Sequence, residues 1–210
     1  MPLEKLVVEL GRTWALWRIE EEEETLAEMV SSLEELSDTV TSPQKRLEWL
    51  AGRVLVKEVM EAMDLNFQGI VKDDFGKPYP VGYDYQISLS HSFPFVAVLL
   101  DKYESVGIDL EQPKEKLLRI ASRIHHVDEV KDAGTDIIKH CIYWCAKETL
   151  IKIYGKKDLI FSENMRILPF QRQMEGNIIG KIIVKDMERV IPLYYKVYPE
   201  FVLVFNKRME

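Results

Sequence analysis

The sequence predicts an α+β fold of two similar halves, residues 1–102 and 103–210, each with a long helix packed on a small antiparallel sheet. Each half contains one long stretch with apolar residues at helical spacing, followed by short apolar runs between turn residues. The halves also share a local pattern, because an aromatic residue and a proline precede an apolar run in both, at Phe93 and at Tyr198. A site built from both halves would lie in the cleft between them.

Two helices are predicted in the first half. Ser42 and Pro43 are typical of an N-cap and a first-turn proline, and they begin a long helix that should end near Met63. The segment 76–80 contains a glycine and two prolines and is predicted to be a loop. A shorter helix is expected at residues 25–36, after an acidic run, with its apolar residues at helical spacing: Leu26, Met29, Val30, Leu33 and Leu36.

The second half should contain a helix from Ile137 to Tyr154, with Gly155 as its C-cap. Strands are predicted where β-branched and aromatic residues gather between turn residues, at residues 87–90, 95–100, 106–111, 178–184, 193–197 and 201–205.

The composition is that of an ordinary soluble globular protein. Hydrophobic residues make up 47% of the chain, yet no apolar segment approaches the roughly 18 to 20 residues that cross a bilayer. The N-terminal residues lack the layout of a signal peptide, so a cytoplasmic protein is expected. A formal charge of -7 argues against a general nucleic-acid binder. Cys141 and Cys145 are too few for a disulfide framework and are interpreted as reduced core thiols.

Two acidic residues form the first candidate site. Asp109 and Glu111 lie two apart in a predicted strand, so both carboxylates project from one face. Adjacent like charges repel unless a cation lies between them, and hard oxygen ligands of this kind suit Mg²⁺. The Asp-x-Glu pattern is common, however, and by itself most often marks solvent-facing charges.

A second group of residues lies on the predicted second-half helix. Trp144, Glu148 and Lys152 follow one face at intervals of four, and Lys147 is beside them. A surface ion pair would explain Glu148 and Lys152 alone. A tryptophan on the same stripe instead indicates a buried edge or a cleft.

Basic and hydroxyl residues form two further groups in the first half. Arg46, Arg53 and Lys57 are spaced to lie along one side of the long helix, where they are either a solvated surface or a phosphate clamp. Ser90 and His91 lie at a strand end, where a histidine beside hydroxyls is either structural or part of a phosphate pocket. No aspartate is placed to suggest a serine-hydrolase triad.

Together, these motifs resemble the paired signature of the phosphopantetheinyl transferase superfamily. The signature comprises Val-Gly-Ile-Asp-Leu-Glu at 106–111 and Trp-Cys-Ala-Lys-Glu-Thr-Leu-Ile-Lys at 144–152. Upstream signatures are present as Gly-Lys-Pro at 76–78 and Ser-His-Ser at 90–92. The chain is more similar to the monomeric, two-lobed type that activates peptide synthetases than to the short trimeric type of fatty-acid synthesis.

The resemblance implies an enzyme, a holo-[acyl-carrier-protein] synthase or 4′-phosphopantetheinyl transferase. Such an enzyme transfers the phosphopantetheine of coenzyme A to a serine of an apo carrier protein and releases 3′,5′-ADP. By similarity, Asp109, Glu111 and Glu148 would hold Mg²⁺, and Glu148 and Lys152 would be catalytic. The residues implied to bind coenzyme A are Arg46, Arg53, Lys77, Pro78, Ser90, His91, Lys147 and Lys152.

Two other classes of protein are alternatives to a phosphopantetheinyl transferase. A metal-dependent nuclease also uses clustered carboxylates and a lysine, but the acidic balance and the absence of an Asp/Glu-x-Lys spacing on a strand disfavour it. A non-catalytic coenzyme A-binding protein is disfavoured by the complete set of three acidic residues.

Overall fold

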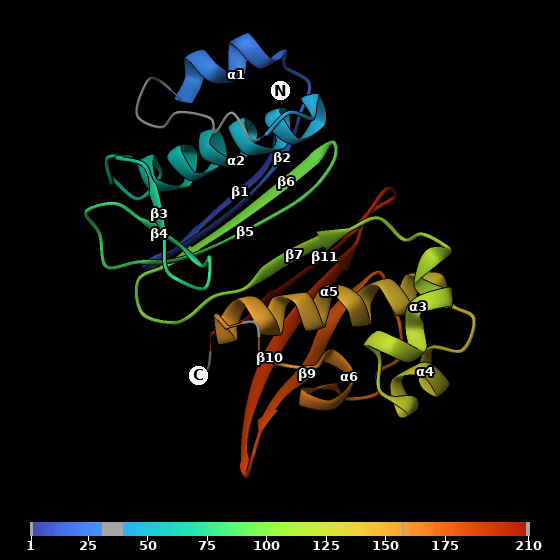
Figure 1. Ribbon diagram of the computed structural model, residues 1–210. Coiled ribbons are helices and arrows are strands. Elements are labelled where there is room, and N and C mark those ends of the chain that lie inside the picture. Colours follow the sequence, from blue (N-terminus) through green and yellow to red (C-terminus); the bar gives the residue numbers. More distant parts are fainter. Residues whose placement is uncertain (1, 31–39, 157, 209–210) are drawn as a thin grey trace. The chain divides into compact units, whose positions relative to one another are not determined.

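The structure, a computed structural model, describes residues 2–30, 40–156 and 158–208. It has the expected mixture of helices and antiparallel sheets (Figure 1). The chain divides into two compact units, Met1–Val106 and Gly107–Glu210, which are called unit 1 and unit 2 below.

Unit 1 contains a four-stranded antiparallel sheet in the order β1-β2-β6-β5. Its central strand β6 is buried along its whole length, as its continuous apolar run indicates. The strands β1 and β2 were not among those predicted. The bounds of the four strands are β1 Leu3–Glu9, β2 Arg12–Arg18, β5 Gln86–Ser92 and β6 Phe95–Asp101.

One long helix, α2 (Pro43–Glu61), covers this sheet and buries Leu55 and Val59 in the core of unit 1. It begins after Ser42 with a proline in its first turn, as predicted. A shorter helix, α1 (Glu23–Val30), packs on α2 and begins within the acidic run. Leu33 and Leu36, the last apolar positions of the predicted first helix, lie outside the described residues.

A small two-stranded sheet completes unit 1. It pairs β3 (Ile70–Lys72) with β4 (Pro78–Pro80), so the prediction that residues 76–80 are all loop was wrong for the last three. A proline donates no hydrogen bond to its neighbour, but an edge position in a short ladder tolerates that loss.

Unit 2 contains a five-stranded sheet in the order β7-β11-β10-β9-β8. This sheet differs from that of unit 1 in strand number and order, and the symmetry between the halves stays a prediction. The bounds are β7 Ile108–Glu111, β8 Met165–Ile167, β9 Glu175–Val184, β10 Met187–Val197 and β11 Val202–Asn206.

The long helix of unit 2, α5 (Ile137–Tyr154), packs along this sheet and ends at Gly155, whose positive φ of 80° confirms the predicted C-cap. Gly107, the residue before β7, lies close to α5. A Cβ atom there would lie 2.2 Å from the backbone oxygen of Thr149, so the approach requires a glycine. Three shorter helices were not predicted: α3 Lys116–Ile124, α4 Val127–Ala133 and α6 Phe161–Asn164.

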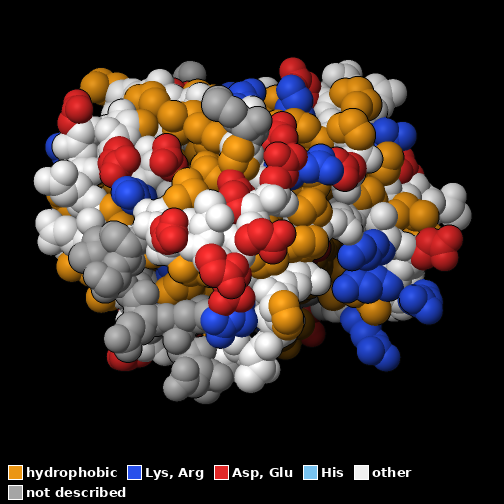
Figure 2. All heavy atoms as spheres, turned by 90° about the horizontal axis from the view of Figure 1, so that it is seen from above, with side chains coloured by type: hydrophobic (Ala, Val, Ile, Leu, Met, Phe, Trp, Pro, Cys, Tyr) orange, Lys and Arg blue, Asp and Glu red, His pale blue; other side chains and the backbone are white. Residues whose placement is uncertain are grey.

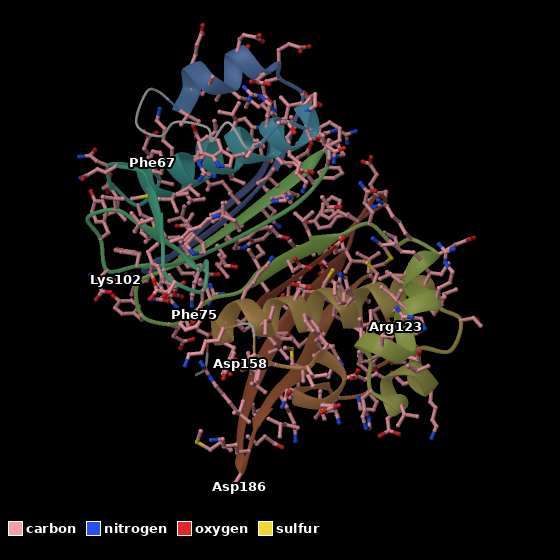
Figure 3. All side chains as sticks on the ribbon, in the orientation of Figure 1. Phe67, Phe75, Lys102, Arg123, Asp158 and Asp186 are labelled. Atoms are coloured by element: carbon pink, nitrogen blue, oxygen red, sulfur yellow. The ribbon has the colours of Figure 1, made fainter. Side chains whose placement is uncertain are left out.

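Charged side chains are unevenly spread over the surface. Lys and Arg side chains gather at one side of the face shown in Figure 2. In unit 2, Arg123 is an exposed residue of α3, and Asp186 lies at the tip of the β9–β10 hairpin (Figure 3). None of the described helices is both long and apolar enough to span a membrane.

Candidate active site

The predicted acidic strand and the predicted helix face meet in unit 2. The Lys152 ammonium on α5 lies 2.8 Å from Asp109 Oδ1 on β7 and also donates a hydrogen bond to the carbonyl of Ile108, at 2.9 Å. Two turns earlier on α5, Trp144 Nε1 donates a hydrogen bond to Glu111 Oε1, at 3.3 Å. The helix and the strand are therefore joined by the residues that the sequence singled out.

The electrostatics of this site link its three carboxylates. Burial and, after it, the charge of the neighbouring Asp109 raise the pKa of Glu148 to about 7, although the charge of Lys152 acts in the opposite direction. Burial, followed by the charge of Asp109, also raises the pKa of Glu111, although its hydrogen bond from Trp144 acts in the opposite direction. Asp109, Glu111 and Glu148 are thus close enough to repel one another in a poorly solvated place.

The donor chemistry of this site fits a hard divalent cation. Carboxylate oxygens are the ligands that Mg²⁺ prefers, and a cation would relieve the repulsion that raises the pKa of Glu148. Within the described part of the chain, however, no group of three or more His, Cys, Asp or Glu side chains is placed so that it could hold a metal ion. The cation observed beside Asp109 is instead the ammonium of Lys152.

The raised pKa of Glu148 predicts how stability depends on pH. Because the pKa of about 7 in the folded chain exceeds the ordinary 4.5, the folded state binds this proton more tightly than the unfolded chain does. The free energy of unfolding should therefore fall as the pH rises from 4.5 to 7. Glu148→Gln removes this effect and should raise the free energy of unfolding by about 2 to 3 kcal/mol at pH 8.

Urea denaturation of metal-free protein at pH 8 and at pH 4.5 checks this expectation. The two proteins should differ little at pH 4.5, where Glu148 of the wild type is protonated in the folded state and about half protonated in the unfolded state. Adding MgCl₂ at pH 8 should stabilise the wild type more than the variant. Equal free energies of unfolding for the two metal-free proteins at pH 8 would contradict the raised pKa of Glu148.

Lys147 takes a different place from the other residues on α5. Its side chain is fully buried, and its ammonium lies 2.6 Å from Glu129 Oε2. It also donates hydrogen bonds to the carbonyls of Ile124 and Phe161. These partners join α5 to the ends of α3 and α6 and to α4. The contact of Lys147 with coenzyme A stays a prediction, and its observed partners favour a structural role.

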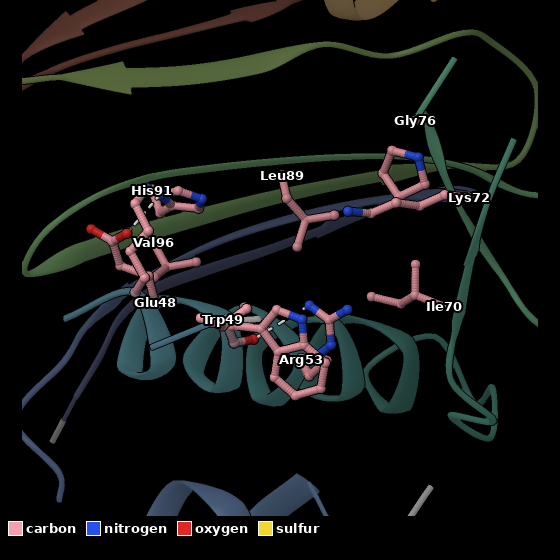
Figure 4. Close-up of a pocket in the computed structure, with 13 residues that line it drawn as sticks. Glu48, Trp49, Arg53, Ile70, Lys72, Gly76, Leu89, His91 and Val96 are labelled. Carbon is pink, nitrogen blue, oxygen red and sulfur yellow. Dashed lines mark hydrogen bonds and ion pairs between the residues drawn. The ribbon is translucent and has the colours of Figure 1, made fainter. Parts of the chain in front are cut away.

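A pocket of about 320 Å³ lies in unit 1 (Figure 4). Three cationic side chains line it, Lys45 and Arg53 from α2 and Lys72 from β3, so it suits an anionic ligand. The Arg53 guanidinium lies 3.5 Å from the centre of the Trp49 ring. Together these two side chains form one wall of the pocket, which is both cationic and aromatic. The other lining residues are Val40, Glu48, Gly52, Ile70, Gly76, Pro78, Leu89, His91 and Val96.

Three of the residues predicted to bind coenzyme A line this pocket, namely Arg53, Pro78 and His91. Two others are not among its lining residues. Ser90 is buried in β5, with 7% of its surface exposed. Lys77 Nζ donates a hydrogen bond to Ser105 Oγ, at 2.8 Å.

Arg46, the remaining predicted residue in unit 1, contacts α1. Its Nε atom donates a hydrogen bond to Glu23 Oε1 at 2.8 Å, and this bond lowers the pKa of Glu23. Lys57 also faces α1, where it donates to the carbonyl of Met29. The side of α2 that carries Arg46 and Lys57 therefore holds α1, and any role of Arg46 toward coenzyme A stays a prediction.

Lys45, Trp49, Lys72 and Glu48 line the pocket but were not predicted to do so. A signal for two of them was present, because Lys45, Trp49 and Arg53 follow one another at intervals of four on α2 and so share a face. Which face of α2 lines the pocket, this one or the one that carries Arg46, depends on where α1 packs. Lys72 comes from β3, which was not predicted.

Unit 2 thus combines a five-stranded antiparallel sheet, a long helix and three carboxylates that influence one another's charge. Residues 105–194 match the family model of the 4′-phosphopantetheinyl transferase superfamily. This segment lies almost wholly in unit 2 and contains the site residues Asp109, Glu111, Glu148 and Lys152. None of the curated proteins compared matches the chain. The family match supports a transferase, with phosphopantetheine transfer as its general activity.

Proposed function

We propose that this protein is a magnesium-dependent 4′-phosphopantetheinyl transferase that modifies a serine of an apo carrier protein with the phosphopantetheine arm of coenzyme A. The observation that carries the proposal is the meeting of Glu148 and Lys152 on α5 with Asp109 and Glu111 on β7, within the segment that matches the family. We place the enzyme in the cytoplasm as a monomer of the two-lobed type that activates peptide synthetases.

The reaction requires negative charge to be neutralised and the reactants to be positioned. A phosphoanhydride carries anionic oxygens that repel an incoming nucleophile, and a bound Mg²⁺ would reduce that repulsion. Asp109, Glu111 and Glu148 would hold the ion. Lys152, whose side chain is about a quarter exposed, brings a second positive charge to the same place. Its existing bond to Asp109 keeps that charge beside the acidic residues.

Glu148 is the group proposed to move a proton. In the cation-free chain, burial and the charge of Asp109 raise the pKa of Glu148 to about 7, so its carboxyl group can take up or release a proton near neutral pH. In the proposed step, Glu148 accepts the hydroxyl proton of the carrier serine, directly or through a water molecule. The serine oxygen bonds to the β-phosphorus of coenzyme A, the anhydride bond breaks, and 3′,5′-ADP leaves.

The basic pocket of unit 1 is proposed to bind the nucleotide end of coenzyme A. Its cations Lys45, Arg53 and Lys72 suit phosphate groups, and the indole of Trp49 offers a surface on which an aromatic base can stack. Arg53, Pro78 and His91 in this pocket are residues that the sequence had already assigned to coenzyme A.

Mass spectrometry of apo carrier proteins incubated with the enzyme, coenzyme A and MgCl₂ tests the proposal. A carrier that gains the mass of phosphopantetheine supports the activity, and several apo carriers show which one is the substrate. No mass gain with any carrier, together with intact binding of coenzyme A, would point to a non-catalytic binder. Nicking of plasmid DNA in Mg²⁺ would point to a nuclease.

The outer face of α3 is where we expect the carrier protein to bind. One side of α3 buries Leu117 and Ala121, whereas Lys116, Arg119 and Arg123 are exposed on the other. The exposed side is basic in a chain whose net charge is -7, and the carriers of this family are expected to be acidic.

Reversing two of these charges should weaken the use of the carrier without affecting coenzyme A. Arg119→Glu combined with Arg123→Glu should raise the KM for the carrier by about tenfold or more, because attraction becomes repulsion. The KM for coenzyme A should change by less than about twofold. Lys185→Glu, at the exposed turn between β9 and β10, is the matched control. Steady-state kinetics with each substrate varied in turn would separate the two effects, and an unchanged KM for the carrier would exclude this face.

A further inference from the structure

The outer edge of strand β1 in unit 1 is open to another strand. β1 is the first strand of its sheet, and within the described parts of the chain no strand pairs with its outer side. The strand at the opposite edge of the sheet, β5, is contacted by β4. An edge strand presents main-chain N–H and C=O groups to solvent, and these groups can accept a further strand.

Apolar side chains are exposed along this edge. Leu6 and Val8 lie two apart in β1, so they point to the same face, and 38% and 53% of their surfaces are exposed. Leu10, in the turn that follows β1, is 86% exposed. Proteins commonly protect an edge with a very short strand or a proline, but β1 has seven residues and none of them is a proline. The edge therefore offers apolar surface as well as main-chain groups.

The charged residues of β1 are placed symmetrically on its other face. Lys5 and Glu9 lie two residues on either side of Val7, so these three side chains share one face. The pairing of β1 with β2 is regular over this stretch, and the Lys5 ammonium lies 5.1 Å from the centre of the Trp14 ring. A lysine on an edge strand ordinarily discourages pairing. In β1, however, the same face carries an acidic residue that could neutralise the lysine of a second copy.

One antiparallel register of two β1 strands matches all of these side chains. If the Val7 residues of two copies lie opposite each other, Lys5 of each copy faces the partner's Glu9. On the other face, Leu6 of each copy then lies opposite the partner's Val8. A shift of two residues in either direction would instead place Lys5 or Glu9 opposite Val7. Charge and apolar contacts therefore favour the same register.

We infer that the β1 edge pairs with the β1 edge of a second copy of this chain, antiparallel and about a two-fold axis at Val7. The pairing joins two four-stranded sheets into one, and it does not depend on the proposed function. Two short strands bury less than the roughly 1,200 Å² of a stable interface, so we expect weak association with a Kd of about 10 to 100 µM. The single chain proposed above is then the form present at low concentration.

Sedimentation velocity of the full chain, over concentrations from about 1 to about 300 µM, tests this inference. The wild type should change from single chains to pairs over this range. Lys5→Glu brings two acidic side chains opposite each other on both sides of the axis and should raise the Kd by about tenfold or more. Glu9→Lys should have the same effect, because it opposes two lysines. Lys185→Glu, at an exposed turn of unit 2, should behave as the wild type.

Exchanging the two charges provides a test that loss of folding cannot imitate. The double variant Lys5→Glu, Glu9→Lys restores opposite charges across the axis and should pair with a Kd within about threefold of the wild type. An equimolar mixture of the two single variants should form mixed pairs, although each variant alone stays single.

Two results would overturn the inference. One is a wild-type chain that stays single at about 300 µM, which would leave the edge to a strand of another protein. The other is a pair that both single variants retain, since the contact would then lie elsewhere on the surface. Pairing is measured without coenzyme A or a carrier protein. Its failure therefore does not affect the proposed transferase activity, and a failure of carrier transfer does not affect the pairing.

Discussion

Glu148→Gln should lower the turnover of apo carrier protein by about 10²- to 10⁴-fold, the range over which a positioned proton acceptor contributes. Glutamine keeps the shape of the side chain but cannot take up a proton. It also removes one of the three carboxylates whose mutual repulsion contributes to the raised pKa of Glu148. Because proton transfer occurs in the chemical step, the fall should appear in kcat rather than in the KM for coenzyme A.

The measurement is the rate of 3′,5′-ADP release at saturating MgCl₂ and coenzyme A. Glu163→Gln, on an exposed residue of α6, is a matched control for the loss of a negative charge in the same unit. Asp109→Ala should also abolish most of the activity, since it removes the partner of Lys152 as well as a carboxylate. Near wild-type rates for Glu148→Gln in the presence of Mg²⁺ would show that another group accepts the proton.

The largest expected effect on stability comes from Lys147→Met. This change leaves the carboxylate of Glu129 buried without its cation, and losing one partner of a buried ion pair costs about 3 to 5 kcal/mol. Glu129 would still accept hydrogen bonds from the backbone N–H groups of His126 and Ile167, which limits the loss. Burial lowers the pKa of Lys147, and the charge of Glu129 offsets part of that effect.

Urea denaturation followed by circular dichroism would measure this change in the free energy of unfolding. The double variant Lys147→Met, Glu129→Gln no longer buries an unpaired charge and should recover part of the loss. Lys131→Met, on the exposed side of α4, controls for replacing a lysine in the same unit. If Lys147→Met were stable and instead raised the KM for coenzyme A, Lys147 would contact the phosphates, as the family resemblance implies.

The sequence indicated the acidic candidate site of unit 2 because the spacing within each pair of residues is local. Asp109 and Glu111 share a strand face, and Glu148 and Lys152 share a helix face, so each pair could be recognised without knowing the fold. Lys147 was placed with them because it precedes Glu148 in the chain. Consecutive residues on a helix point about 100° apart, however, and this rotation turns Lys147 toward Glu129.

The pocket of unit 1 could be predicted only in part, because its residues depend on packing between distant segments. Glu48 resembles an ordinary surface acid in the sequence, and its burial depends on contacts with β5 and with Phe93. The face of α2 that carries Arg46 could not be distinguished from the pocket face until α1 was seen to cover it. The edge strand β1 was missed because several of its apolar side chains, such as Val8, are exposed rather than buried in a core.

Gly107 bears on how this site could be altered by design. The distance between β7 and α5 is set by main-chain atoms, since even a methyl group at this position would collide with the backbone of Thr149. The acidic side chains can therefore be made longer or shorter without changing the distance between β7 and α5. If the proposed divalent ion binds here, exchanging aspartate and glutamate at positions 109, 111 and 148 should change which ion is accepted, whereas any replacement of Gly107 should disturb all of these positions at once.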